Sequence, residues 1–159
     1  MNTNQQGISL TVATSSGVVE GRITRNVMSW EDIPYALPPE GDLRWKAPRP
    51  LISPDSKITP QEGNGCLQEA SIYAGIQGKG IVGQEDCLYL DIKAPLIKDY
   101  SNRSLPVMFW IHGGGNTSGI KDYYNFSELI RKHQVLVVTI NYRLGPMGWF
   151  THPATGTAR

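Results

Sequence analysis

Two uninterrupted apolar runs constrain the fold of this chain more than any other feature. The runs are 107–111 and 135–140, in the second half of a 159-residue sequence. Neither alternates apolar with polar residues, which is typical of strands covered on both faces in a parallel sheet. Between them, 127–133 carries Leu129 and Ile130 among charged residues, as a short amphipathic helix does. The order strand, loop, helix, strand predicts an α/β fold.

The first half of the chain predicts shorter and less regular structure. Up to Arg22, apolar and polar residues alternate around Gly17 and Gly21, which indicates short antiparallel strands joined at glycine turns. Frequent prolines from Ile33 to Pro60 remove amide donors and fix φ, so we expect an ordered but irregular wrap there. The apolar set of the early strands is Leu10, Val12, Val18 and Ile23.

Two further segments precede the apolar runs. Glycines are frequent from 63 to 83 and large apolar residues are few, so we expect a mobile surface loop there. The segment 86–92 alternates, with Leu88, Leu90 and Ile92 on one face, and predicts a strand.

Composition and charge exclude several classes of partner. Lys and Arg total 15 against 14 Asp and Glu, and a net charge of +1 supplies no long-range field for nucleic acid or an anionic membrane. The apolar runs are far shorter than the roughly 20 residues needed to cross a bilayer. No His or Cys spacing indicates a metal site, and we expect no other cofactor. The expected partner is a small, near-neutral molecule.

The amino terminus gives little information on localisation. Residues 1–6 are polar and uncharged, with no apolar stretch behind them, so they do not resemble a signal peptide. A cytoplasmic location and a secreted one after processing both fit this pattern.

A histidine and three glycines, His112, Gly113, Gly114 and Gly115, directly follow the first apolar run. Successive glycines adopt backbone conformations closed to other residues and bring uncovered amides close to a ligand. Two amides aimed at one point stabilise the negative oxygen of a tetrahedral intermediate. A glycine-rich strand-to-helix turn without a ligand explains the same residues, and their spacing leaves both interpretations open.

The candidate side chains near these glycines have structural interpretations. A general base must reach a nucleophile, so His112 is better placed to hold the loop backbone by hydrogen bonds. Ser118 lies outside the Gly-x-Ser-x-Gly turn that exposes a nucleophile, and that turn occurs nowhere in the sequence. We therefore expect Ser118 to make a cap or a structural hydrogen bond. Glu85 and Asp86, beside a strand start, are expected to be ion-pair partners.

The two cysteines flank the glycine-rich segment. A disulfide between Cys66 and Cys87 would remove roughly 3 kcal/mol of denatured-state freedom on the loop-entropy view. Two reduced, half-buried thiols fit the same positions, because cytosolic thiols usually stay reduced. The residues alone leave both states open.

Four separated blocks resemble, in family order, the type B carboxylesterases, which include the cholinesterases and adopt the α/β-hydrolase fold. The resemblance implies that 1–159 is the amino-terminal part of a carboxylesterase type B domain, an incomplete α/β-hydrolase fold that stops before the nucleophile-elbow strand. The blocks are Ile33-Pro34-Tyr35-Ala36 with Pro38-Pro39 and Leu43-Arg44-Trp45, then Glu85-Asp86-Cys87-Leu88-Tyr89-Leu90, then Trp110-Ile111-His112-Gly113-Gly114-Gly115, and Asn141-Tyr142-Arg143-Leu144-Gly145-Pro146.

The resemblance also implies roles for individual residues. The amides of Gly114 and Gly115 would form part of an oxyanion hole, and His112 would support their loop. Asn116 stands where many relatives have an aromatic residue, which leaves the shape of the acyl pocket open. Two structural pairs follow from the same resemblance: Cys66 with Cys87 as a disulfide, and Arg44 with Glu85 as a salt bridge.

The function implied for the full-length form is hydrolysis of small-molecule carboxylic esters through an acyl-enzyme on serine. This chain would supply the oxyanion loop and no nucleophile, acid or base, so we expect no turnover from the 159 residues alone. One alternative is a non-catalytic, cholinesterase-like interaction protein. Esterases similar to hormone-sensitive lipase also use His-Gly-Gly-Gly, but they lack the block from Glu85 to Leu90.

Overall fold

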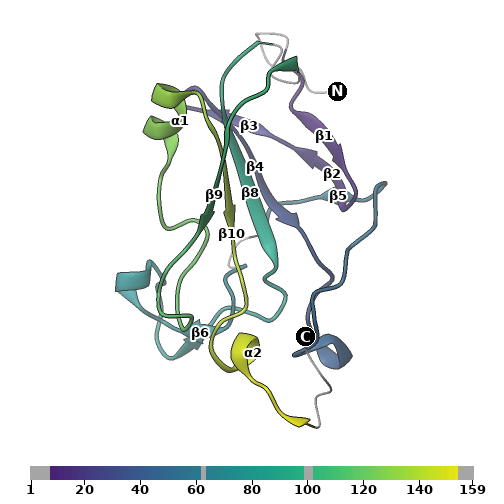
Figure 1. The fold of residues 1–159 in the computed structure, drawn as a ribbon, viewed down its shortest axis with the longest axis vertical. Coiled ribbons are helices and arrows are strands. Elements are labelled where there is room, and N and C mark those ends of the chain that lie inside the picture. The colour runs from purple at the N-terminus through teal and green to yellow at the C-terminus, as the bar shows by residue number, and fades with distance from the viewer. Residues whose placement is uncertain (1–7, 62–63, 99–101, 154–159) are drawn as a thin grey trace.

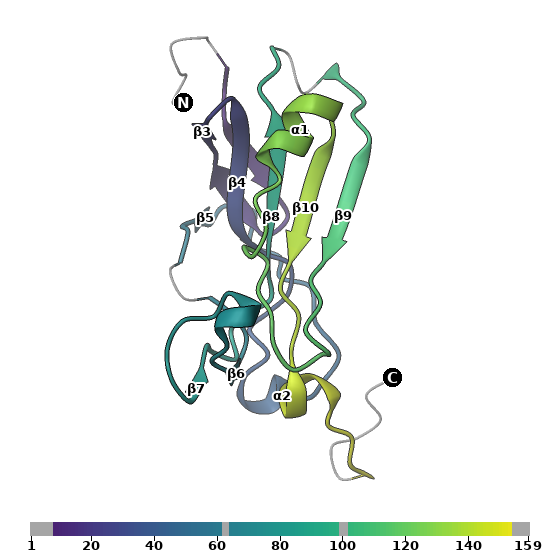
Figure 2. The same cartoon turned by 90° about the vertical axis from the view of Figure 1, so that its left-hand side faces the viewer.

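The computed structural model describes residues 8–61, 64–98 and 102–153. At its centre is a five-stranded sheet in the order β3-β4-β8-β10-β9. Figure 2 shows these strands side by side, with β9 at one edge. Their bounds are β3 Arg22–Thr24, β4 Val27–Pro34, β8 Tyr89–Pro95, β10 Leu136–Ile140 and β9 Val107–Ile111.

The pairing of β9 with β10 is parallel, which confirms the prediction from the two apolar runs. The other neighbours in this sheet pair antiparallel. Because β9 and β10 run in the same direction, both end at one edge of the sheet (Figure 2). The glycine loop that follows Ile111 and the segment that follows Ile140 therefore begin side by side, at the kind of edge where α/β proteins bind ligands.

The predicted helix is present as α1, Ser127–His133. It packs over β8 and β4 on one face of the sheet, as Figure 1 shows, with Ile130 fully buried against Val27 and Val137. Burying a side chain of this kind contributes roughly 2 kcal/mol. The helix ends where Gln134 takes a left-handed conformation. No helix in the described part of the chain is long and apolar enough to cross a membrane.

A smaller sheet covers the opposite face. It contains β1 Thr11–Thr14 and β2 Gly17–Glu20, an antiparallel hairpin, and β5 Lys57–Ile58, which pairs parallel with β2. Successive strand residues point to opposite faces, so Val27 packs toward α1 while Met28 packs toward the smaller sheet.

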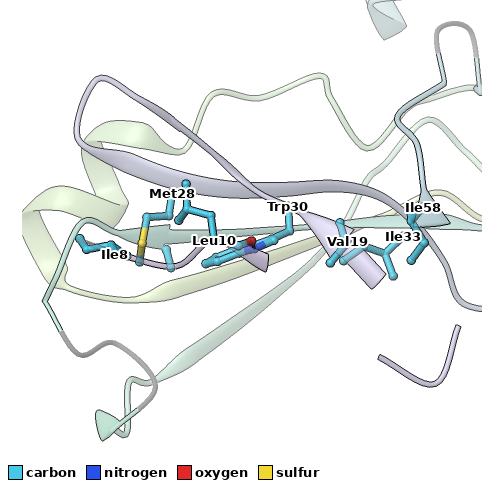
Figure 3. Packing of buried hydrophobic residues seen from close by; sticks show 8 residues of the cluster. Ile8, Leu10, Val19, Met28, Trp30, Ile33 and Ile58 are labelled. Atoms are coloured by element: carbon cyan, nitrogen blue, oxygen red, sulfur yellow. Dashed lines mark hydrogen bonds between the residues drawn. The ribbon is translucent and has the colours of Figure 1, made fainter. Parts of the chain in front are cut away.

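Between the two sheets lies the largest apolar core (Figure 3). Trp30 lies at its middle and donates from Nε1 to the carbonyl of Leu10 at 2.8 Å, so its polar atom is satisfied inside the core. The buried members are Ile8, Leu10, Val19, Met28, Trp30, Ile33, Ile58 and Ala94.

The early strands confirm the predicted antiparallel pattern but differ from it in detail. Val19 is the buried valine of β2, while the predicted Val18 is only partly covered. The long strand β4 was not predicted, because Glu31 and Asp32 interrupt its apolar residues. Asp32 lies at a bulge and has φ of +55°. It is buried, although a charged side chain is usually exposed.

Two other segments depart from expectation. The predicted strand 86–92 is shifted, since β8 runs from Tyr89 to Pro95 and the disulfide-bonded Cys87 precedes it. The glycine-rich segment contains β6 Gln68–Glu69 and β7 Ile81–Val82, which pair antiparallel. It also contains the single-turn helix η2, Ile72–Ala74. The segment is therefore a short ribbon whose first end is buried, and not an unanchored loop. The proline-rich wrap holds only β5, the end of β4 and the single-turn helix η1, Gly41–Leu43, as predicted.

The expectation that both apolar runs are covered on both faces is wrong for β9. The side chains of Val107, Phe109 and Ile111 are 63%, 56% and 61% exposed. The helix side of the sheet covers Met108, but no described element packs on the other face or pairs with the outer edge of β9. An exposed apolar edge strand presents free amides and carbonyls to other strands.

Candidate functional site

The glycine loop leaves β9 in backbone conformations that favour glycine. Gly114 has φ of +113° and Gly115 has φ of +61°, which are left-handed values that other residues adopt at a cost. A Cβ atom built on Gly114 would lie 1.9 Å from the carbonyl oxygen of Ser118, whereas one on Gly115 would meet nothing within 4 Å. Position 114 therefore requires glycine because a side chain has no room there, and position 115 favours glycine because its φ is positive.

The loop is closed by the carbonyl of Gly114 and leaves its own amides uncovered. That carbonyl accepts hydrogen bonds from the amides of Thr117 and Ser118 at 3.1 and 3.2 Å. Within the described residues, the amides of Gly114 and Gly115 donate to no acceptor, and both glycines are exposed. Two neighbouring donors are available to a ligand oxygen.

His112 lies buried at the start of this loop. Its Nδ1 lies 2.9 Å from the carbonyl oxygen of Gly113, and its own carbonyl accepts a 2.7 Å hydrogen bond from the hydroxyl of Tyr142. The two rings stack with centroids 4.3 Å apart. Burial lowers the pKa of His112, which favours the neutral ring. These contacts connect the loop to the segment that follows β10.

A second connection joins the middle of the loop to the same segment. The amide of Gly145 donates to the carbonyl of Asn116 at 2.7 Å. Asn116 has φ of +61°, a value that asparagine tolerates better than most residues. Gly145 begins the short helix α2, Gly145–Trp149, so the loop is held from its first residue to its middle.

A pocket of about 330 Å³ lies beside the glycines. One wall is the loop itself, including Gly114 and Ser118, and another is aromatic. Trp110 packs edge to face on Tyr124 at 5.3 Å between centroids, and Tyr123 packs against Tyr124 at 4.7 Å. An apolar group of modest size would fit against these rings with its polar end near the loop.

Ser118 and Asp86 make structural contacts. Ser118 donates from its backbone amide to the carbonyl of Gly114, as described above, and the cap or structural hydrogen bond expected of its hydroxyl stays a prediction. Asp86 accepts a 2.9 Å hydrogen bond from the hydroxyl of Tyr89. The expectation that Asp86 is an ion-pair partner is not met among the described residues, because this carboxylate lies next to a phenol and not a cation.

Arg44 and Glu85 form a two-point ion pair. The Nε and Nη2 atoms of Arg44 donate to the two carboxylate oxygens of Glu85, each at 2.6 Å. The Arg44 side chain remains 39% exposed, so water screens the pair and reduces its contribution to stability. The pair fastens the proline-rich wrap to the segment before β8.

A disulfide joins Cys66 to Cys87, and both residues are buried. It closes a loop with a sequence separation of 21 and fixes that loop to the start of β8.

Removing this disulfide is expected to destabilise the protein substantially. Substituting both cysteines by alanine should lower the free energy of unfolding by about 3 kcal/mol, since the unfolded chain regains the freedom of the closed loop. Urea denaturation of the double variant and the parent under oxidising conditions measures the difference. Equal unfolding midpoints would contradict the expected contribution.

A buried charge cluster was missed from the sequence. The ammonium of Lys121 lies 2.9 Å from carboxylate oxygens of Asp32 and Asp91 and 2.8 Å from Asp122. Lys121 is 2% exposed and Asp91 is fully buried. The cluster connects β4 and β8 to the segment that follows the glycine loop. Its only sequence signal is acidic residues inside otherwise apolar strands.

The cluster predicts how stability depends on pH. Burial and the nearby Asp122 carboxylate raise the pKa of Asp91 to about 7, although Lys121 opposes them. A carboxyl whose folded pKa exceeds its unfolded value contributes stability below the unfolded pKa and loses it as pH rises through the folded pKa. The free energy of unfolding should therefore fall between about pH 4 and 7.

The variant Asp91→Asn tests this contribution. Its unfolding free energy should depend less on pH in that window than that of the parent, as measured by urea denaturation at a series of pH values. The lowered pKa of His112 acts in the opposite direction in both proteins. The pKa of Asp122 is also lowered, partly by Asp91, so the difference between the two proteins reports the Asp91–Asp122 pair. Parallel pH profiles for the two proteins would contradict the assignment.

The fold is that of the amino-terminal part of an α/β-hydrolase. A solved para-nitrobenzyl (PNB) esterase superimposes with a TM-score of 0.82 and 35% sequence identity, over 95% of this chain and 31% of that one. The chain belongs to the carboxylesterase family, whose sequence model matches residues 8–158.

Curated relatives agree with that assignment. A fumonisin B1 esterase from Sphingopyxis macrogoltabida is 41% identical over 89% of this chain and 26% of its own length. A para-nitrobenzyl esterase from Bacillus subtilis is 39% identical over 87% of this chain and 28% of its own length. The chain thus spans about a quarter of the length of these relatives.

Proposed function

We propose that the complete gene product hydrolyses carboxylic esters through an acyl-enzyme on serine. In this proposal the amides of Gly114 and Gly115 donate to the ester carbonyl oxygen as it becomes negative, and His112 holds their loop. The nucleophile, its base and its acid lie outside these 159 residues. The observation that carries the proposal is the pair of exposed amides of Gly114 and Gly115, which have no acceptor among the described residues and lie two and three positions after the buried His112.

The chemistry follows from where charge develops. When serine attacks an ester, the carbonyl oxygen gains negative charge, and fixed donors stabilise that charge more than they stabilise the neutral substrate. Loss of one such donor raises the barrier by roughly 2.7 to 4 kcal/mol. The aromatic pocket beside Gly114 fits a small apolar part of an ester, and the curated relatives carry esterase names.

One experiment tests this proposal directly. The coding sequence beyond the codon for Arg159 is read, and the complete product is assayed with p-nitrophenyl acetate. We expect a Gly-x-Ser-x-Gly turn, a later acid and histidine, and saturable hydrolysis. The 159-residue chain is the control and should show none. A substituted serine together with no turnover would overturn the proposal in favour of a non-catalytic interaction protein.

A further inference from the structure

One buried side chain connects the disulfide-bonded segment to the glycine loop. Gln68 accepts a 2.8 Å hydrogen bond at Oε1 from the amide of Gly119 and donates from Nε2 to the carbonyl of Gly119 at 2.9 Å. The two residues are 51 positions apart in the sequence. A single amide side chain thus satisfies both backbone groups of Gly119, as a neighbouring strand would.

The Gln68 side chain is itself held in place. Its Nε2 also donates to the carbonyl of Cys66 at 2.9 Å, and Cys66 is bonded to Cys87. The backbone of Gln68 pairs with Val82 in the short ribbon. Gln68 is buried, so water does not compete for these bonds.

Gly119 in turn fixes the parts of the loop that face a ligand. It is buried with φ of +138°, and a Cβ atom there would lie 2.1 Å from Nδ1 of His112, so the histidine ring packs directly on this glycine. The preceding residue, Ser118, donates to the carbonyl of Gly114. A shift of Gly119 would therefore be transmitted to His112 and Gly114 together.

We propose that Gln68 is a positioning residue for the oxyanion loop. It fixes the end of the loop that begins at His112, and so holds the amides of Gly114 and Gly115 in one place before substrate arrives. This inference rests on the proposed esterase function for its kinetic consequence. Its structural consequence, a loop that opens when Gln68 is lost, does not depend on activity.

The kinetic test compares two glutamine substitutions in the complete gene product. Gln68→Met keeps the length of the side chain and removes all its hydrogen bonds. We expect kcat for p-nitrophenyl acetate to fall by at least about tenfold, because misplaced donors lose transition-state stabilisation. KM should stay within about twofold, since the ground state uses these donors less.

Gln84→Met is the matched control. Gln84 lies in the same disulfide-bonded segment and its Nε2 donates to the carbonyl of Asp86 at 2.9 Å, away from the glycine loop. Its kcat should equal that of the parent. An unchanged kcat in Gln68→Met, or an equal loss in both variants, would overturn the inference.

Hydrogen exchange separates this inference from the proposed function. Deuterium uptake by the peptide that covers 112–121 is followed by mass spectrometry in the same three proteins. Gln68→Met should exchange there about tenfold faster or more, because the amide of Gly119 loses its acceptor. Gln84→Met should match the parent. If the product shows no turnover but exchange accelerates only in Gln68→Met, the proposed function fails and the positioning role of Gln68 stands. Unchanged exchange in Gln68→Met would overturn the positioning role.

Discussion

Gly114→Ala should nearly abolish ester hydrolysis by the complete gene product, with kcat reduced by about 100-fold or more. The added Cβ atom meets the carbonyl oxygen of Ser118 at 1.9 Å. Because that oxygen belongs to the backbone, it cannot swing aside, and the loop itself must move. The movement displaces the amide of Gly114 from the developing negative charge.

The control for this prediction is Gly65, a buried glycine close to the same region. A Cβ atom on Gly65 would lie 3.4 Å from Ile120, an ordinary contact distance. Gly65→Ala should therefore keep the parent kcat. Steady-state kinetics with p-nitrophenyl acetate give kcat, and far-UV circular dichroism checks that both variants are folded. A folded Gly114→Ala enzyme with the parent kcat would contradict the role of this amide.

Lys121→Met should destabilise the protein by about 3 to 5 kcal/mol at pH 8, the cost typical of breaking a buried ion pair. The substitution leaves carboxylates of Asp32, Asp91 and Asp122 without the cation that lies within 2.9 Å of each. Burial would lower the pKa of Lys121, but Asp91 and Asp122 outweigh it and raise the pKa, so the lysine stays charged at this pH.

A nearby lysine provides the comparison. Lys93 lies 3.9 Å from Asp91 and has a more exposed side chain, so Lys93→Met should cost under about 1 kcal/mol. Adding Asp91→Asn to Lys121→Met should restore part of the stability. Without Lys121 the pKa of Asp91 rises further, so the folded variant must bind a proton at Asp91 at pH 8, a cost that asparagine does not carry. Urea denaturation measures all four proteins. Equal losses for the two lysine variants would show that the cluster does not depend on Lys121.

Local patterns predicted those elements whose structure depends on their own residues. The helix 127–133 was predicted with its observed bounds, because its two apolar residues and basic last turn satisfy the requirements of a short helix locally. The parallel pairing of 107–111 with 136–140 also follows from composition, since apolar runs of this kind belong to sheets inside α/β proteins.

The same local patterns did not predict contacts between residues that are distant in the sequence. Nothing near Asp32 in the sequence indicates that Lys121 will neutralise it, and nothing near Gln68 indicates Gly119. The exposure of Phe109 likewise depends on which elements lie against β9, and the strand's own apolar residues predicted coverage. These failures share one cause: whether a side chain is buried or exposed is decided by partners that are distant in the sequence.

The same distinction between local features and long-range contacts applies to the candidate site. The glycine loop could be singled out because steric freedom is a property of its residues, but their spacing left a ligand-free turn equally open. The roles of Gly114, Gly115 and His112 came from the family resemblance and stay predictions. The contacts that hold the loop, from Tyr142, Gly145 and Gln68, come from three other segments and appear only in the fold.

Inhibition by a transition-state analogue tests the central claim most directly. A trifluoromethyl ketone that adds to the catalytic serine gives an oxyanion where the amides of Gly114 and Gly115 are proposed to donate. If they stabilise the transition state, Gly114→Ala should raise the inhibition constant by the same factor, about 100-fold, by which it lowers kcat/KM. An inhibition constant equal to that of the parent, despite reduced kcat/KM, would contradict the assignment of this loop as the oxyanion hole.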